Sequence, residues 1–260
     1  MSASPTSGAV AFIPARAGSK RVAGKNVAPL AGHPLMAYTI AAARASGVFD
    51  AVVVSTDSDR YAEIARHYGA EVPALRPEAI AGDTSPDIDW VEHTLNVLES
   101  AGRRYEAFSI LRPTSPFRQA ATIRRAWEAF AADRGADSLR AVELCQQHPG
   151  KMWIKRGNRL LPLLPFGPED APWHSGQYPS LPVVYAQNAS LEIAWTRIVR
   201  QGRSIAGVDI LPFLTQGFEG FDLNHPRDWH LAESLVSRGE AALPVVPEPA
   251  FPVDRIEHRT

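Results

Sequence analysis

The chain has 260 residues, 45% hydrophobic and 21% charged, and its 27 Lys and Arg against 28 Asp and Glu leave a formal net charge of −1. This composition fits a large globular domain, and without a basic excess it argues against nucleic-acid binding. The single cysteine excludes an intramolecular disulfide framework. No uncharged run reaches the roughly 18 apolar residues of a membrane span, and no signal-peptide pattern opens the chain. We therefore expect a cytoplasmic protein with no membrane partner.

Strands and helices alternate along the first half of the chain. Short apolar or β-branched runs predict strands at Ala9–Ile13, Ala51–Ser55, Glu71–Val72 and Ala107–Leu111. Helical patterns occupy His33–Ser46, Asp57–Tyr68, Asp87–Ala101 and Ala120–Ala132. Repeated strand–helix units imply right-handed crossovers, and therefore an α/β fold with a mostly parallel sheet covered on both faces.

The pattern changes at about residue 141. Residues 146–182 are rich in proline, glycine and tryptophan, which forbids a continuous helix, and a hairpin is expected around Gly157. We interpret this stretch as a small inserted lobe between the two parts of a core, residues 1–145 and 183–245. Strands are then predicted at Leu191–Trp195 and Ile205–Ile210 and a helix at Asp228–Arg238, and the proline-rich segment from Ala242, including the tail 246–260, is expected to be loosely held.

The segment after the first strand reads IPARAGSKRVAGKN, residues 13–26, and carries four cationic side chains and two glycines. A strand that leads into a glycine-containing loop is how α/β folds bring backbone N–H groups against phosphates. The cations would neutralise a polyphosphate during its transfer. The alternative is a surface loop whose Lys and Arg are solvated.

This segment resembles the signature of the CMP-sialic acid synthetase family, also called acylneuraminate cytidylyltransferases. Further stretches agree with it in the same order: VVVSTDS at 52–58, RPEAIAGDTS at 76–85, LRPTSPFR at 111–118, HPGKMW at 148–153 and FDLNHPRDW at 221–229. Related Kdo enzymes have Gly-Lys-Pro where this chain has Gly24-Lys25-Asn26, so the resemblance is nearer to the sialate branch. It implies a Rossmann-like nucleotidyltransferase that transfers CMP from CTP to an acidic acceptor and releases pyrophosphate.

The resemblance also implies where the nucleotide binds. The residues carried over to CTP binding are Ala15, Arg16, Ser19, Lys20, Arg21, Lys25, Asn26, Arg76, Asp83 and Thr84. Catalysis is assigned to Arg16, Arg21, Lys25 and Asp222. For two of these residues a structural role is the alternative, because Arg76 precedes a proline and can shape a turn, while Asp83 can cap the following helix.

The expected cofactor is Mg²⁺, since phosphoryl transfer from a nucleoside triphosphate normally uses it. The family pattern Asp-Ile-Asp corresponds to Asp222-Leu223-Asn224, and alternation would place Asp222 and Asn224 on one face. Asn224 departs from the pattern: its amide oxygen brings no charge, so it either binds the metal weakly or contacts the acceptor. Asp222 capping the next turn is the structural alternative. Asp228 is expected to start the last helix.

The acceptor side diverges most from the family. Arg112 stands where sialate enzymes often have glutamine, Tyr178 where an arginine is expected, and Gln187-Asn188-Ala189 replaces an Asn-Gly pair, whereas Lys151 is retained. These residues are predicted to bind a small acidic acceptor, either a sialic acid-like nonulosonic acid or a small phosphonate. The resemblance further implies a homodimer in which the inserted lobe takes part.

Two other functional classes remain open at this point. Asn224 is consistent with a nucleotide-binding module that has lost catalysis. A different nucleotidyltransferase, using another nucleoside triphosphate and a phosphorylated sugar, is the third interpretation, which Gly24-Lys25-Asn26 argues against.

Overall fold

The structure is a computed structural model that describes residues 8–18 and 22–252, so the predictions for Ser19, Lys20 and Arg21 lie outside the described residues. The chain divides into two compact units. Met1–Ala141 and Asn188–Thr260 form the core unit, and Val142–Gln187 forms the inserted unit. The predicted lobe, 146–182, falls within the bounds of the inserted unit.

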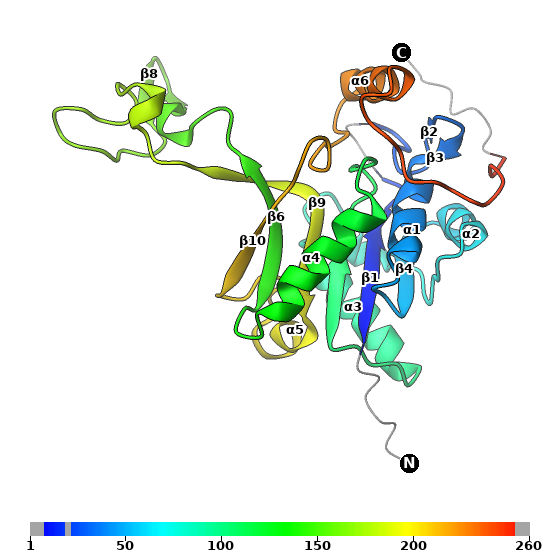
Figure 1. Cartoon of the computed structure of the whole chain (residues 1–260). Coiled ribbons are helices and arrows are strands. Elements are labelled where there is room, and N and C mark those ends of the chain that lie inside the picture. The colour runs from blue at the N-terminus through cyan, green and yellow to red at the C-terminus, as the bar shows by residue number, and fades with distance from the viewer. Residues whose placement is uncertain (1–7, 19–21, 253–260) are drawn as a thin grey trace. The chain divides into compact units, whose positions relative to one another are not determined.

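A six-stranded sheet is the centre of the core unit, with the order β10-β6-β9-β5-β1-β4 (Figure 1). Its strands are β1 (Ala9–Pro14), β4 (Ala51–Ser55), β5 (Ala107–Ile110), β6 (Ser138–Leu144), β9 (Tyr185–Trp195) and β10 (Ile210–Leu214). β1 pairs in parallel with both β4 and β5, and β9 runs antiparallel to β5. The predicted α/β fold with a mostly parallel sheet is confirmed.

Helices cover both faces of this sheet, as the unbroken apolar run of β1 predicts. Ala11 and Ile13 of β1 pack in a cluster with α1 (Leu35–Ser46), α2 (Asp59–His67) and α4 (Ala120–Ala132). Val10 and Phe12 point the other way and pack with α3 (Asp87–Ser100) and α5 (Thr196–Gly202). The alternation of side chains along β1 therefore contributes to two hydrophobic clusters, one on each face of the sheet.

Local chemistry fixes where the helices begin. The helix expected from His33 begins at Leu35, because His33–Pro34 forms the short strand β3 against β2 (Pro29–Leu30). α2 begins after Ser58, whose hydroxyl accepts the N–H of Tyr61 at 3.4 Å. A short 3₁₀ helix, η1 (Glu78–Ile80), precedes α3.

The last helix, α6 (Pro226–Ser237), begins two residues earlier than the predicted Asp228. The carboxylate of Asp228 accepts the backbone N–H groups of Asn224 at 2.9 Å and His225 at 2.7 Å. Asp228 is thus not the first residue of the helix, as the sequence predicted, but its third, and its carboxylate caps the N-terminus.

One strand predicted for the second half of the chain is wrong. The strand expected at Ile205–Ile210 does not form there; Gly207 has a positive φ of 70°, and β10 begins only at Ile210. β10 contains Pro212, which it accommodates because it lies at the edge of the sheet.

The segment from Ala242, expected to be loosely held, is bound to the core as far as Pro252. His67 Nε2 lies 2.7 Å from Pro249 O, Phe251 N donates to the hydroxyl of Tyr68 at 2.9 Å, and Arg60 lies over the Phe251 ring. Prolines in this segment did not prevent docking, because aromatic and charged side chains of α2 hold it.

The inserted unit contains the predicted hairpin, as β7 (Trp153–Arg156) and β8 (Arg159–Pro162) joined through Gly157 at a positive φ of 58°. Two short 3₁₀ helices, η2 (Pro149–Lys151) and η3 (Tyr178–Ser180), complete its regular structure among the described residues. His148 is buried; its Nδ1 accepts the N–H of Gly150 at 3.0 Å and its Nε2 lies 2.9 Å from Pro182 O.

Across both units, we find among the described residues no helix with the length and apolar character needed to cross a membrane.

Candidate active site

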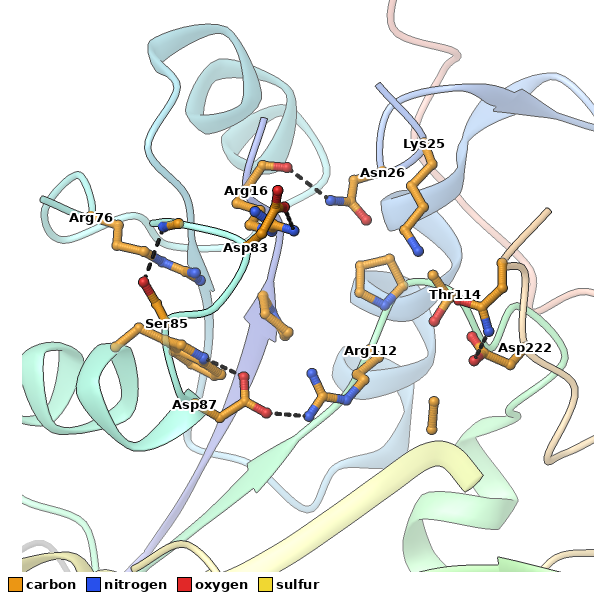
Figure 2. Close-up of a pocket in the computed structure, with 16 residues that line it drawn as sticks. Arg16, Lys25, Asn26, Arg76, Asp83, Ser85, Asp87, Arg112, Thr114 and Asp222 are labelled. Carbon is orange, nitrogen blue, oxygen red and sulfur yellow. Dashed lines mark hydrogen bonds and ion pairs between the residues drawn. The ribbon is translucent and has the colours of Figure 1, made fainter. Parts of the chain in front are cut away.

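A cavity of about 680 Å³ opens in the core unit where β1 and β5 end (Figure 2). Its lining comprises Pro14, Arg16, Lys25, Asn26, Arg76, Gly82, Asp83, Ser85, Asp87, Trp90, Arg112, Pro113, Thr114, Ala189, Asp222 and Asn224. The chain passes from β1 to β4 on one side and later to β5 on the other side of β1. Ligands of open α/β sheets bind at the carboxyl ends of the strands beside such a reversal of strand order.

Arg16 and Asp83 form an ion pair on one side of the cavity. Arg16 Nη2 lies 2.5 Å from Asp83 Oδ1, and both side chains are 29% exposed. Asn26 donates from Nδ2 to the carbonyl of Arg16 at 3.2 Å, which ties the two ends of the opening loop together. Asp83 makes no cap on α3, which begins after Pro86 without a side-chain cap. The predicted nucleotide residues Arg16, Lys25, Asn26, Arg76 and Asp83 thus meet in one cavity.

Arg76 is a buried cation of the cavity wall. Its Nε donates to Ser55 Oγ at 3.1 Å and its Nη2 to Ser55 O at 3.0 Å, and the guanidinium lies 5.0 Å from the centroid of the Trp90 ring. Burial lowers the pKa of Arg76 to about 10, which leaves it charged at neutral pH. The side chain predicted to bind the nucleotide is therefore held in a fixed position at the cavity.

Arg112 belongs to a line of alternating charges. Its Nη2 donates to Asp87 Oδ2 at 2.5 Å and to Glu192 Oε1 at 3.0 Å, and Glu192 also pairs with Arg140. Burial alone would raise the pKa of Asp87, but the charge and hydrogen bond of Arg112 outweigh it and lower that pKa, helped by Trp90, whose Nε1 donates at 2.7 Å. Arg112 reaches the cavity as expected, yet two carboxylates already balance its charge.

Asp222 and Asn224 lie side by side at the opposite wall. Asn224 Nδ2 donates to Asp222 Oδ2, and Lys25 Nζ lies 3.5 Å from the carbonyl oxygen of Leu223 between them. The other carboxylate oxygen, Asp222 Oδ1, is buried and accepts no hydrogen bond within the described part of the chain.

This donor set fits Mg²⁺. Mg²⁺ takes oxygen ligands and is usually held by one or two carboxylates together with substrate phosphates, so a buried carboxylate oxygen without a partner suits it. The described residues contain no group of three or more His, Cys, Asp or Glu that could hold a metal alone. Any ion at Asp222 would therefore need further ligands from water or the substrate.

Three predicted residues of the core unit do not line the cavity. Ala15 is buried in the core and its N–H donates to Ser55 O at 2.9 Å, and Thr84 is exposed beside the cavity loop. Asn188 turns away: its Nδ2 donates to Thr215 Oγ1 at 2.9 Å and its Oδ1 accepts the N–H of Ser190 at 3.2 Å. Its neighbour Ala189 lines the cavity instead.

The remaining acceptor residues belong to the inserted unit. Lys151 Nζ lies 5.4 Å from the centroid of the Tyr178 ring and 3.4 Å from His174 O, while Gln187 is exposed on β9. The lysine and tyrosine thus contact each other within that unit.

Sequence reasoning missed Ser85, Asp87, Trp90 and Thr114 as lining residues. Ser85 and Thr114 stand inside the quoted motifs, so the motifs contained that signal. Asp87 and Trp90 are the first and fourth residues of α3 and were interpreted only as part of a helix, because nothing in the sequence places that helix start against Arg76 and Arg112.

The fold and the cavity define a Rossmann-like nucleotide-binding protein, and comparisons with known proteins agree. Two solved structures share the fold. A CMP:2-keto-3-deoxy-manno-octonic acid synthetase complexed with CTP has a TM-score of 0.64 and 16% identity, and the match covers 90% of this chain and 100% of the other. A 4-diphosphocytidyl-2C-methyl-D-erythritol synthase from Anaerococcus prevotii has a TM-score of 0.62 and 12% identity, and the match covers 89% of this chain and 99% of the other.

Sequence comparisons give the family. Residues 10–143 match the family described as Cytidylyltransferase. A CMP-N,N'-diacetyllegionaminic acid synthase of Legionella pneumophila is 37% identical over 239 residues, which cover 90% of this chain and 98% of the relative. An N-acylneuraminate cytidylyltransferase of Escherichia coli is 45% identical over 114 residues, which cover 44% of this chain and 26% of that relative. A pseudaminic acid cytidylyltransferase of Campylobacter jejuni is 33% identical over 149 residues, covering 57% and 64%. The chain belongs to the cytidylyltransferase family and is a nucleotidyltransferase of the CMP-sialic acid synthetase type.

Proposed function

We propose that this enzyme transfers CMP from CTP to a nonulosonic acid, a nine-carbon sugar acid of the sialic acid kind, and releases pyrophosphate. The observation that carries the proposal is the cavity at the ends of β1 and β5, where Arg16, Lys25, Arg76 and Arg112 gather with Asp222. The relative that matches 90% of this chain is named for the synthesis of a CMP-linked acid of this kind. Pseudaminic and N-acylneuraminic acids, in the names of two further relatives, belong to the same class, which favours a sugar acid over a small phosphonate.

The proposed mechanism is direct attack of an acceptor hydroxyl oxygen on the α-phosphorus of CTP: the new phosphorus–oxygen bond forms as the bond from the α-phosphorus to the oxygen of pyrophosphate breaks, and the hydroxyl proton passes to solvent. Lys25 and Arg16 would bind the phosphates and offset the charge that develops on the leaving pyrophosphate. Arg21 and its neighbours Ser19 and Lys20 are proposed to join them. Arg76 and Trp90 would hold the nucleoside side, and Arg112 would donate from its guanidinium to the acceptor carboxylate.

Mg²⁺ is proposed to be held by Asp222, with Asn224 as a neutral second ligand. When bound, the ion would offset the negative charge of the phosphate oxygens, which otherwise repels the attacking oxygen. Asp222 then serves to fix the ion, while Lys25 near Leu223 O keeps this segment against the cavity.

The test is to incubate the protein with CTP, Mg²⁺ and one acceptor at a time, and to measure pyrophosphate release. Legionaminic, pseudaminic and N-acetylneuraminic acids and phosphonoformate form the panel, and we expect turnover with at least one sugar acid that EDTA abolishes. Lys25→Met should lower kcat/KM about a hundredfold, the size seen when one transition-state donor is removed. The matched control is Arg227→Met, since Arg227 is 84% exposed at the start of α6.

Two alternatives have their own outcomes in this experiment. Tight binding of CTP in calorimetry, with no pyrophosphate from any acceptor, would show a nucleotide-binding module, the interpretation that Asn224 suggests. Turnover with UTP or GTP and a phosphorylated sugar in place of CTP and an acid would show a different nucleotidyltransferase.

A homodimer in the cytoplasm, where CTP is made, is proposed for the working enzyme. The inserted unit exposes large apolar side chains that a monomer would leave in water, among them Trp153, Leu160 and Phe166, which are 44%, 59% and 55% exposed. Light scattering after size exclusion should give twice the chain mass of 28.3 kDa. A mass of one chain across the working concentration range would contradict this proposal.

A further inference from the structure

Arg118 is a buried guanidinium beneath the turn that follows β5. It is 1% exposed. Its Nη1 donates to Ser190 O and Arg112 O, and its Nη2 donates to Arg112 O at 3.3 Å and to Thr39 Oγ1 at 2.9 Å. The side chain thus ties this turn to β9 and α1.

Among the described residues, no carboxylate pairs with this charge. Within residues 8–18 and 22–252 Arg118 forms no ion pair, and its Nε is buried without a hydrogen-bond partner. Burial lowers the pKa of Arg118 to about 9, so the group is still a cation at neutral pH. Buried charges in proteins are normally paired, because carbonyl oxygens solvate a cation but do not neutralise it. Two arginines nearby follow that rule, because Arg112 and Arg140 both pair with Glu192.

The Arg118 guanidinium is hydrogen-bonded to the backbone of the cavity wall. Arg112, Pro113 and Thr114 line the cavity, and the carbonyl of Arg112 is the group to which Arg118 donates twice. The side chain itself is sealed from solvent, so water screens its field less than it screens the field of an exposed cation. A negative ligand in the cavity would therefore feel this charge through the wall to which Arg118 is hydrogen-bonded.

We propose that Arg118 is a positioning residue whose counter-charge is the bound substrate: its buried cation raises the affinity of the cavity for the phosphates of the nucleotide. This inference rests on the proposed nucleotide site. It assigns a role to a residue that contacts no ligand itself and acts through the wall formed by Arg112, Pro113 and Thr114.

The experiment compares ligands that share a nucleoside and differ in charge. Binding of cytidine, CMP and CTP is measured by calorimetry for the natural protein, Arg118→Gln and Arg118→Lys at one ionic strength. Glutamine keeps donors for the carbonyls and removes the charge, whereas lysine keeps the charge and loses the guanidinium geometry. Arg124→Gln is the matched control, because Arg124 also donates to two carbonyls, those of Ala45 and Ser46.

For Arg118→Gln we expect CTP affinity to fall about tenfold and CMP affinity about threefold, with cytidine affinity unchanged, since the Coulomb energy scales with ligand charge. Arg118→Lys should stay within about threefold for all three ligands. A loss that is equal for cytidine and CTP would overturn the proposal and leave Arg118 a purely structural residue, and so would unchanged CTP affinity. Should the glutamine variant not fold, the lysine variant decides: CTP affinity lost while cytidine affinity is kept overturns the proposal, and retention of both supports it. Failure of the natural protein to bind CTP would instead refute the proposed function.

Discussion

Replacement of Glu192 by glutamine should destabilise the protein strongly. Glu192 lies between Arg140 and Arg112, and the side chains of Glu192 and Arg140 are only 7% and 10% exposed. Glutamine keeps the volume and an oxygen for Arg112, but it leaves Arg140 as a buried cation without its partner. Breaking a buried pair in this way costs about 3–5 kcal/mol. At roughly 2–4 °C per kcal/mol for a protein of this size, the lower figure corresponds to a melting temperature about 9 °C lower.

Urea unfolding and calorimetry of Glu192→Gln measure this loss directly. Glu233→Gln is the control, because its carboxylate is 54% exposed and 3.9 Å from His230, so its removal should change the free energy of unfolding by less than about 0.5 kcal/mol. The double variant Glu192→Gln with Arg140→Met should recover most of the loss, since it removes the buried cation as well. A change below about 1 kcal/mol for Glu192→Gln would refute the reasoning, because it would mean that water reaches Arg140.

Three further outcomes are expected. Because the pKa of Asp87 is lowered in the folded protein, its ion pair with Arg112 stabilises the fold fully above the unfolded pKa of about 3.9. This contribution is lost as the pH falls through the lower folded pKa. Asp87→Asn should therefore make the unfolding midpoint depend less steeply on pH between pH 7 and pH 2. Deletion of residues 245–260 removes the docked Phe251, and calorimetry should show at least about 2 kcal/mol less stability. Gly207→Ala should also lower the melting temperature, since φ at Gly207 is +70° and the new Cβ would lie 2.3 Å from the Cβ of Asp137.

The sequence predicted the first half of the fold well, because strands such as Ala51–Ser55 and helices such as Ala120–Ala132 have one dominant period. It failed at β6. Arg140 interrupts the apolar run of that strand, and only the fold shows that Glu192 on β9 lies beside it. A charged residue that is buried in an ion pair between two strands thus breaks the apolar pattern from which a buried strand is predicted.

In the candidate site, too, some residues could be predicted from the sequence and others could not. The opening loop and Asp222 are encoded in local motifs, so their meeting in one cavity could be predicted from resemblance. The partners of Arg112 could not: Asp87 and Glu192 are distant in sequence, and only the packing of α3 and β9 against β5 brings them to the same guanidinium.

The position of β9 has a consequence for how the chain is divided. β9 lies between β5 and β6, so the chain leaves the sheet at the end of β6 and returns in the adjacent strand. The outgoing and returning segments are already joined there, where Cys145 N donates to Val184 O at 2.9 Å. With the two ends held together, each doubling of the length of the inserted segment adds only about 0.6 kcal/mol of closure entropy. The inserted unit is therefore one long connection between two neighbouring strands, and we expect a change in its length to leave the register of the sheet and the cavity intact.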